Sequence, residues 1–130
     1  MSNTRLRLVL AGLTASGALA VGGVHVAEAK SVSQLGASCS QGTVASMIYL
    51  SSGSRVTVGF GSNDVRSLGT WHVVVTDNGV PTLDHTLTAT VPAWTVSTNR
   101  TLTKGAHVLA LTAENLSNGE VCTNSVSNKV

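Results

Sequence analysis

The sequence is poor in aromatic residues and in charge. Its 130 residues include two tryptophans, one tyrosine and one phenylalanine, and only 11% are charged. Surfaces that stack bases or sugars use several exposed rings, and phosphate-binding faces need clustered lysine and arginine. The cations beyond residue 29 are scattered along the chain and exceed the acids there by one, so we expect no nucleic-acid partner. Tyr49 is the best candidate for an outward ring, and one ring makes a weak platform.

Hydrophobic runs long enough to span a membrane are missing, except at the start of the chain. Arg5 and Arg7 precede an apolar run rich in small residues, which ends in the tripeptide Ala27–Ala29. This is the layout of a secretory signal peptide, so we expect residues 1–29 to be removed and residues 30–130 to form one extracellular domain. The alternative is a retained anchor, since about 20 residues can cross a bilayer. Glycines and hydroxyl groups weaken that alternative, so we expect no membrane association after signal removal.

Cysteine is also rare, with Cys39 and Cys122 near the two ends of the expected domain. In an oxidising compartment such a pair predicts a disulfide. Closing a loop of this length stabilises the fold by about 4 kcal/mol through the unfolded state. The alternative, a catalytic or metal-binding thiol, lacks a neighbouring histidine or a CxxC pair.

Helical spacing is absent over any three turns, and short β-branched runs alternate with turn residues instead. The pattern predicts an all-β fold, a two-sheet antiparallel sandwich of about seven strands. The expected strands are Val44–Leu50, Arg55–Phe60, Thr70–Thr76, His85–Val91, Trp94–Thr98, Ala106–Glu114 and Val121–Val130.

Alternation within these runs assigns side chains to the core or to solvent. The residues expected in the core are Val56, Val58, Phe60, Trp71, Val73 and Val75. We expect His72 to point outward, and His85 to share a face with Leu87, Ala89 and Val91. Chain reversals are predicted at Thr76–Pro81 and Asn115–Glu120, where glycine, asparagine and aspartate gather. Pro92 lies between two expected strands and marks an edge, a bulge or a strand break.

The domain resembles the immunoglobulin-like and fibronectin type III-like sandwiches. Trp71 in "GTWHVVV" lies on the expected third strand, where those folds place a core tryptophan. Leu102 and Gly105 match the residues around their sixth-strand tyrosine, and His107 replaces that tyrosine. The resemblance implies that His107 is a structural corner residue bonded to a backbone carbonyl. The outlying cysteines imply a bacterial-type module whose disulfide ties the chain ends together.

Catalytic and metal-binding motifs are missing. Asp84 and His85 adjoin, but consecutive strand residues face opposite ways, and no "GxSxG" elbow is present. His72 and His85 have no recognised metal-ligand spacing, and the Asp77–Asp84 segment offers too few oxygens for calcium. We therefore expect no cofactor, no metal and no enzymatic activity. For an enzyme, Asp84, His85 and His107 are the residues to mutate first.

Two N-glycosylation sequons occur, "NRT" at Asn99 and "NLS" at Asn115. They matter only in a eukaryotic secretory pathway, which the sequence does not establish. Chance occurrence in a threonine- and serine-rich chain is the alternative.

These observations predict a secreted, non-enzymatic module that binds an extracellular protein or a cell-surface component through loops or an edge strand. The alternative is a small inhibitor of an extracellular hydrolase, with "NGVPTLD" as a loop stiffened by proline. The residues expected to contact the partner lie in two reversals: Asp77, Asn78, Gly79, Val80, Pro81 and Asp84 in one, and Asn118, Gly119 and Glu120 in the other.

Overall fold

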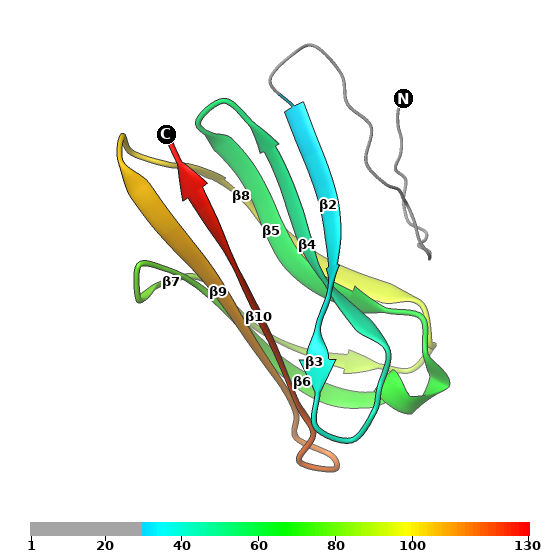
Figure 1. The fold of residues 1–130 in the computed structure, drawn as a ribbon. Helices are drawn as coiled ribbons and strands as arrows, with labels where there is room; N and C mark the ends of the chain where they lie inside the picture. The colour runs from blue at the N-terminus through cyan, green and yellow to red at the C-terminus, as the bar shows by residue number, and fades with distance from the viewer. Residues whose placement is uncertain (1–29) are drawn as a thin grey trace.

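The protein is a sandwich of two antiparallel β-sheets, seen in a computed structural model that describes residues 30–130 (Figure 1). The expected signal peptide, residues 1–29, lies outside the described residues. One sheet has the strand order β2-β4-β5-β8, and the other has the order β3-β10-β9-β6-β7. The predicted all-β, two-sheet sandwich is confirmed. No helix within residues 30–130 has the length and apolar character needed to cross a membrane.

The strands are bounded as follows. The four-stranded sheet contains β2 (Lys30–Gly36), β4 (Ala45–Ser52), β5 (Arg55–Ser62) and β8 (Trp94–Thr101). The five-stranded sheet contains β3 (Ser38–Cys39), β6 (Gly69–Asp77), β7 (Val80–Ala89), β9 (Ala106–Asn115) and β10 (Val121–Lys129). A short 3₁₀ helix, Val65–Ser67, lies between β5 and β6.

The seven expected strands are all present, together with two additional strands, and their boundaries differ from the prediction by at most three residues except in one strand. The chain enters as β2 beside β4, and then crosses to the other sheet as β3 beside β10. The expected strand His85–Val91 instead runs from Val80 to Ala89. Pro81 fits within it because β7 is an edge strand, where one backbone N–H is dispensable.

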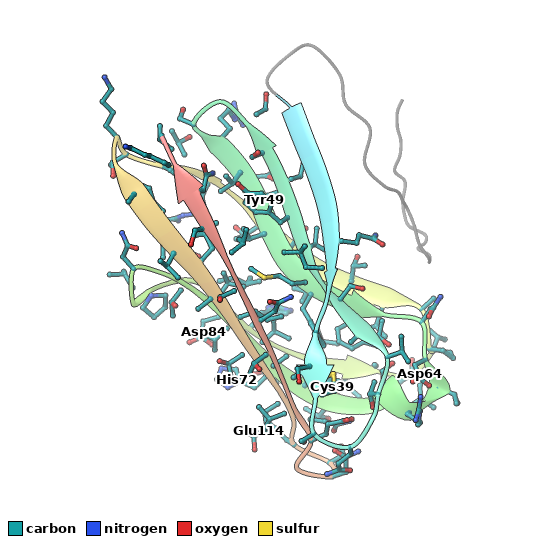
Figure 2. All side chains as sticks on the ribbon, in the orientation of Figure 1. Cys39, Tyr49, Asp64, His72, Asp84 and Glu114 are labelled. Atoms are coloured by element: carbon teal, nitrogen blue, oxygen red, sulfur yellow. A yellow bond between two sulfur atoms is a disulfide. The ribbon has the colours of Figure 1, made fainter. Side chains whose placement is uncertain are left out.

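The core lies between the sheets and follows the predicted alternation. Its central aromatic cluster joins Phe60, Trp71 and Trp94, whose ring centroids lie 5.4 to 5.7 Å apart. The predicted core positions on β5 and β6 are all buried. The expectation that the Tyr49 ring faces solvent is wrong. Tyr49 is only 8% exposed and belongs to the core (Figure 2). Met47 and Tyr49 lie on the same face of β4, so one alternation buries both.

The disulfide predicted between Cys39 and Cys122 is present. The two cysteines are direct partners in the β3 and β10 ladder. The bond therefore joins the start of the domain to its last strand within one sheet.

The connections between strands divide the sandwich into two unlike ends (Figure 1). At the first, which we call the loop end, the chain turns through residues 40–44, 63–68, 90–93 and 116–120. At the second, the turn end, the connections have two to four residues, against four to six at the loop end, and comprise residues 53–54, 78–79 and 102–105. In Figure 1 the loop end occupies the bottom and lower right, and the turn end lies at the left, where the chain reaches its C-terminus.

Candidate functional site

The two reversals expected to bind a partner differ in structure from the prediction. Asp77–Asp84 is not an open loop, because only Asn78 and Gly79 lie between β6 and β7. Both adopt positive φ, 49° and 86°, as a two-residue hairpin turn requires. Val80, Pro81 and Asp84 belong to strand β7, which corrects their expected place in a loop.

The second reversal lies at the loop end, and it hides one of its expected contact residues. Asn118 and Gly119 are exposed, but Glu120 is only 1% exposed. Its carboxylate accepts hydrogen bonds from the backbone N–H of Gln41 at 2.8 Å and of Thr43 at 3.1 Å, and from the Thr43 hydroxyl. Glu120 is therefore an internal anchor for residues 40–44, which corrects its expected place on the surface.

The environment of Glu120 favours its charged form. Burial alone would raise the pKa of this carboxyl, but the hydrogen bonds from Thr43 and Gln41 outweigh it, and the pKa lies below its ordinary value. A buried charge is tolerated where donors surround it, as they do here. The anchor is thus an ionised carboxylate at neutral pH.

A second carboxylate joins residues 40–44 to residues 63–68. Asp64 accepts a hydrogen bond from the Val44 backbone N–H at 2.9 Å and pairs with the Arg66 guanidinium at 2.9 Å. The Arg66 side chain, followed by the backbone N–H groups of Val44 and Arg66, lowers the pKa of Asp64 to about 2. The Ser62 hydroxyl also donates to the Val44 carbonyl, at 2.7 Å. Two loops of the loop end are therefore fixed to each other.

Buried polar side chains connect the remaining loops. Ser67 is fully buried, and its hydroxyl contacts the Pro92 carbonyl at 3.4 Å and accepts from the Trp94 indole at 2.9 Å. Asn115, also fully buried, donates to the Leu68 carbonyl at 3.1 Å and accepts from the Ser117 N–H at 2.9 Å. All four loops of the loop end are thus tied together through side chains that solvent does not reach.

Exposed apolar side chains project from these interconnected loops. Five residues carry them, with exposed fractions from 38% to 65%: Val44, Val65, Leu68, Val91 and Leu116. Each of the four loops contributes at least one. Sequence patterns did not single out this group, because its members are scattered over 73 positions and come to the same end of the sandwich only in the folded chain. A fixed apolar surface of this kind is suited to binding another protein.

His107 occupies the turn end and has the predicted bond to the backbone. Its Nε2 donates to the Thr103 carbonyl at 2.7 Å, and Nδ1 lies 2.7 Å from a carboxylate oxygen of Asp77. The carboxylate of Asp77, then the Thr103 carbonyl, raises the pKa of His107 above its ordinary value. The raised pKa favours the charged form, in which both ring nitrogens donate and His107 has no lone pair to accept a proton from a substrate. The Asp77 partner comes from another strand and was not predicted.

His72, Asp84 and Glu114 lie together on the outer face of the five-stranded sheet (Figure 2). The His72 Nε2 is 2.7 Å from an Asp84 carboxylate oxygen, and Glu114 is the direct ladder partner of His72. Asp84 therefore contacts His72 from the neighbouring strand and not the adjacent His85. His85 itself is exposed, although Leu87 and Ala89 on its face are more buried. His72 and Asp84 therefore form a pair on the open surface of the sheet.

One cluster of potential metal ligands is found within residues 34–130. It consists of Cys39, Cys122 and Glu120. The two sulfur atoms are bonded to each other, and Glu120 is occupied by Thr43 and Gln41. In its disulfide form the cluster offers no free thiolate to a metal.

The two sequons differ in accessibility. Asn99 lies exposed on the edge strand β8 and uses only its carbonyl oxygen, which accepts from the Thr57 hydroxyl. Asn115 is fully buried, and its amide nitrogen donates to the Leu68 carbonyl. A glycan on Asn115 would displace that bond, so only Asn99 can carry one in the folded domain.

The fold defines a disulfide-linked, two-sheet antiparallel β-sandwich with a rigid, partly apolar loop end. Comparison with models of protein families, with curated proteins and with solved structures finds no match for this chain.

Proposed function

We propose that the protein is a secreted, non-enzymatic module that binds a protein partner through its loop end. The signal-like first 29 residues and the disulfide support export to an oxidising compartment. Trp71 on β6 and His107 at the start of β9 support the resemblance to immunoglobulin-like sandwiches, in which strand-connecting loops at one end often bind partners.

The observation that carries the proposal is the set of exposed apolar side chains on interconnected loops. Val44, Val65 and Val91 are each more than half exposed, on three different loops. Removing such groups from water contributes about 25 cal/mol for each Å² of apolar surface buried. Soluble proteins seldom gather such groups on one surface without a partner.

The hydrogen bonds beneath this surface reduce the cost of binding. Loops that order on binding lose conformational entropy, whereas loops already fixed by Glu120, Asn115 and Ser67 lose little. Polar groups on exposed Gln41, Arg66 and Asn118 belong to the same loops as the apolar side chains and can form the hydrogen-bonded rim that protein interfaces need.

The alternative function, inhibition of an extracellular hydrolase, stays a prediction. Its proposed inhibitory loop, "NGVPTLD", is a two-residue turn followed by strand β7. A panel of extracellular proteases and glycosidases incubated with the purified domain tests it. Absence of inhibition at micromolar protein removes this alternative.

The test of the proposal compares two pairs of charge-introducing substitutions. Val65→Asp with Leu116→Asp alters the loop end, where these side chains are 65% and 54% exposed. The matched control, Val80→Asp with Val108→Asp, alters side chains that are 64% and 48% exposed near the turn end. Each immobilised domain is incubated with the native extracellular fraction, and the captured proteins are quantified by mass spectrometry.

We expect the loop-end double variant to capture a specific protein at least about tenfold less than the native domain. One unfavourable contact of about 1.4 kcal/mol lowers affinity by that factor. The control pair should retain capture, and both variants should keep the thermal midpoint within a few degrees. Equal capture by the two variants contradicts the proposed location. Loss of capture only in the control places the binding site near the turn end.

A further inference from the structure

The turn end carries most of the positive charge of the domain. Of the five lysine and arginine side chains that the structure describes, four belong to this end: Arg55, Arg100, Lys104 and Lys129. All four are exposed. The fifth, Arg66, lies at the loop end and is paired with Asp64. The cations that are scattered in the sequence thus gather at one end, which corrects the expectation that they are dispersed.

The strand ladders explain this gathering. Arg55 opens β5 opposite Thr101, so it lies one residue from Arg100 across the ladder. The Leu102 N–H donates to the Ser54 carbonyl at 2.7 Å, which brings the β8–β9 connection against the β4–β5 turn. Two hydrogen bonds between Gly105 and Val130 then place Lys104 near Lys129. The cations surround the end as a rim.

Acidic groups do little to offset these charges. Among the described residues, Asp77 is the acid nearest this end, and its carboxylate is engaged by His107 at 2.7 Å. No described ion pair involves any of the four cations at the turn end. A rim of unpaired cations attracts anions over distances up to the screening length of about 10 Å at 0.1 M salt.

A depression in this end contains one of the cations. It has a volume of about 280 Å³ and lies on the four-stranded sheet, where Leu50, Thr57 and Asn99 are neighbours across three strands. Ser52 and Arg55 complete its polar lining. The volume is near the lower limit of small-molecule pockets, about 300 Å³, so it can hold one sugar unit with an acidic group.

We propose that this depression binds an acidic group of an extracellular polysaccharide. The Arg55 guanidinium matches the two oxygens of a carboxylate or sulfate. Ser52, Thr57 and Asn99 offer hydroxyl and amide groups to the sugar hydroxyls, and half-buried Leu50 contacts the apolar face of a ring. Arg100, Lys104 and Lys129 increase the attraction for the rest of the polymer. The site is separate from the proposed protein-binding loop end.

An acidic polysaccharide fits better than other polyanions. No aromatic side chain lies in the depression, so neither bases nor sugar rings can stack there. Single-stranded nucleic acid depends on such stacking, whereas an acidic sugar can be held through its charged group and its hydroxyls. An anionic membrane favours basic surfaces whose apolar side chains insert between lipids, whereas four of the six residues that line this depression are polar.

The experiment measures binding of the mature domain to polygalacturonate and dextran sulfate, which carry carboxylate and sulfate groups respectively. Neutral dextran, polyglutamate, single-stranded DNA and phosphatidylglycerol vesicles are the comparison probes. Arg55→Gln is the test variant, and Arg66→Gln removes the same charge from the loop end. Lys104→Gln probes the rim.

We expect one or both acidic polysaccharides to bind more tightly than every comparison probe. Arg55→Gln should weaken that binding at least tenfold, and Lys104→Gln about two- to threefold, with a weaker dependence on salt. Arg66→Gln should change it less than twofold.

Three results would overturn the inference. If polyglutamate binds as tightly as the acidic polysaccharides, charge alone accounts for the interaction. Tighter binding to DNA or to vesicles than to the polysaccharides would assign the site to another class of partner. Equal losses in Arg55→Gln and Arg66→Gln remove the site from the depression. Because Arg55→Gln and Lys104→Gln leave every loop-end side chain in place, protein capture at the loop end by these two variants is a separate outcome.

Discussion

The loop end and the turn end of the sandwich solve the same problem, reversing the chain, in different ways. At the loop end, long connections are held by side chains that reach across the sequence, such as Glu120 binding Thr43 across 77 positions. At the turn end, Asn78 and Gly79 reverse the chain locally with positive φ. The anchored loops carry exposed apolar groups at one end, whereas strand ends bring a rim of cations together at the other.

The two ends also differ in how pH affects them. Glu120 and Asp64 have lowered pKa values, so their stabilising contribution is present above the ordinary carboxyl pKa and is lost as pH falls. His107 has a raised pKa, so its contribution is complete below the ordinary histidine pKa and is lost as pH rises through the raised value. Acid weakens the loop end, and mild alkali weakens the turn end.

The largest effect should come from removing the covalent bond beside the loop end. Replacing both cysteines, Cys39→Ala and Cys122→Ala, should lower the free energy of unfolding by about 4 kcal/mol. The thermal midpoint should fall by roughly 15 to 30 °C in a domain of this size. Chemical denaturation of the variant beside the oxidised protein measures this. A loss below about 1 kcal/mol would show that the disulfide is not a main source of stability.

Glu120→Gln should have the next largest effect. The amide oxygen can still accept from both backbone N–H groups, because these share one carboxylate oxygen. Its N–H₂ group then faces the Thr43 hydroxyl, whose proton loses its acceptor, and the remaining bonds lose the charge of the carboxylate. An unsatisfied buried group costs about 1 to 3 kcal/mol, and we expect about 2 kcal/mol from urea denaturation at pH 7. The difference between variant and native protein should shrink as pH falls toward 3. A difference that grows on acidification contradicts the ionised anchor.

His107→Gln should alter the pH dependence of stability at the turn end. The native protein should lose thermal stability as pH rises from about 6.5 to 9, because the imidazolium bonded to Asp77 is discharged. The variant cannot titrate and should show a flatter midpoint over this range. A native midpoint that rises from pH 6.5 to 9 rules out the charged pair.

The smallest effect should come from glycine turns, with similar cost at both ends. Gly79 at the turn end has φ 86° and Gly119 at the loop end has φ 80°, and neither has an atom within 4 Å of an added Cβ. Alanine at each position should therefore cost only the left-handed backbone, about 1 kcal/mol. Calorimetry of both variants checks this. A much larger loss for Gly119→Ala would indicate a constraint at the loop end beyond backbone conformation.

The sequence predicts the strands well where apolar residues alternate strongly. Val56, Val58 and Phe60 on β5 are an example, and all three are buried. The first strand, "KSVSQLG", has only two large apolar residues, so its pattern is too weak to identify β2. Strand β3 has two residues and is defined by its disulfide and its pairing with β10. Pairing with neighbours, and not local pattern, forms these strands.

The candidate surfaces were less predictable, because each depends on contacts between distant segments. Glu120 has the sequence context of an exposed turn, and its burial follows from donors contributed by residues 41 and 43. The cation rim depends on strand direction. Arg55 begins a strand and Arg100 nearly ends one, and these positions coincide only because β5 and β8 are antiparallel neighbours.

Amide hydrogen exchange at the loop end tests the central claim, that its loops form one fixed surface. The N–H groups of Gln41 and Thr43 bond Glu120, and that of Leu116 bonds the Thr70 carbonyl at 2.7 Å. We predict that all three exchange at least about 100-fold more slowly than unprotected peptide amides. Glu120→Gln should accelerate exchange at Gln41 and Thr43 far more than at Leu116. Exchange of all three at unprotected rates in the native protein would contradict the account.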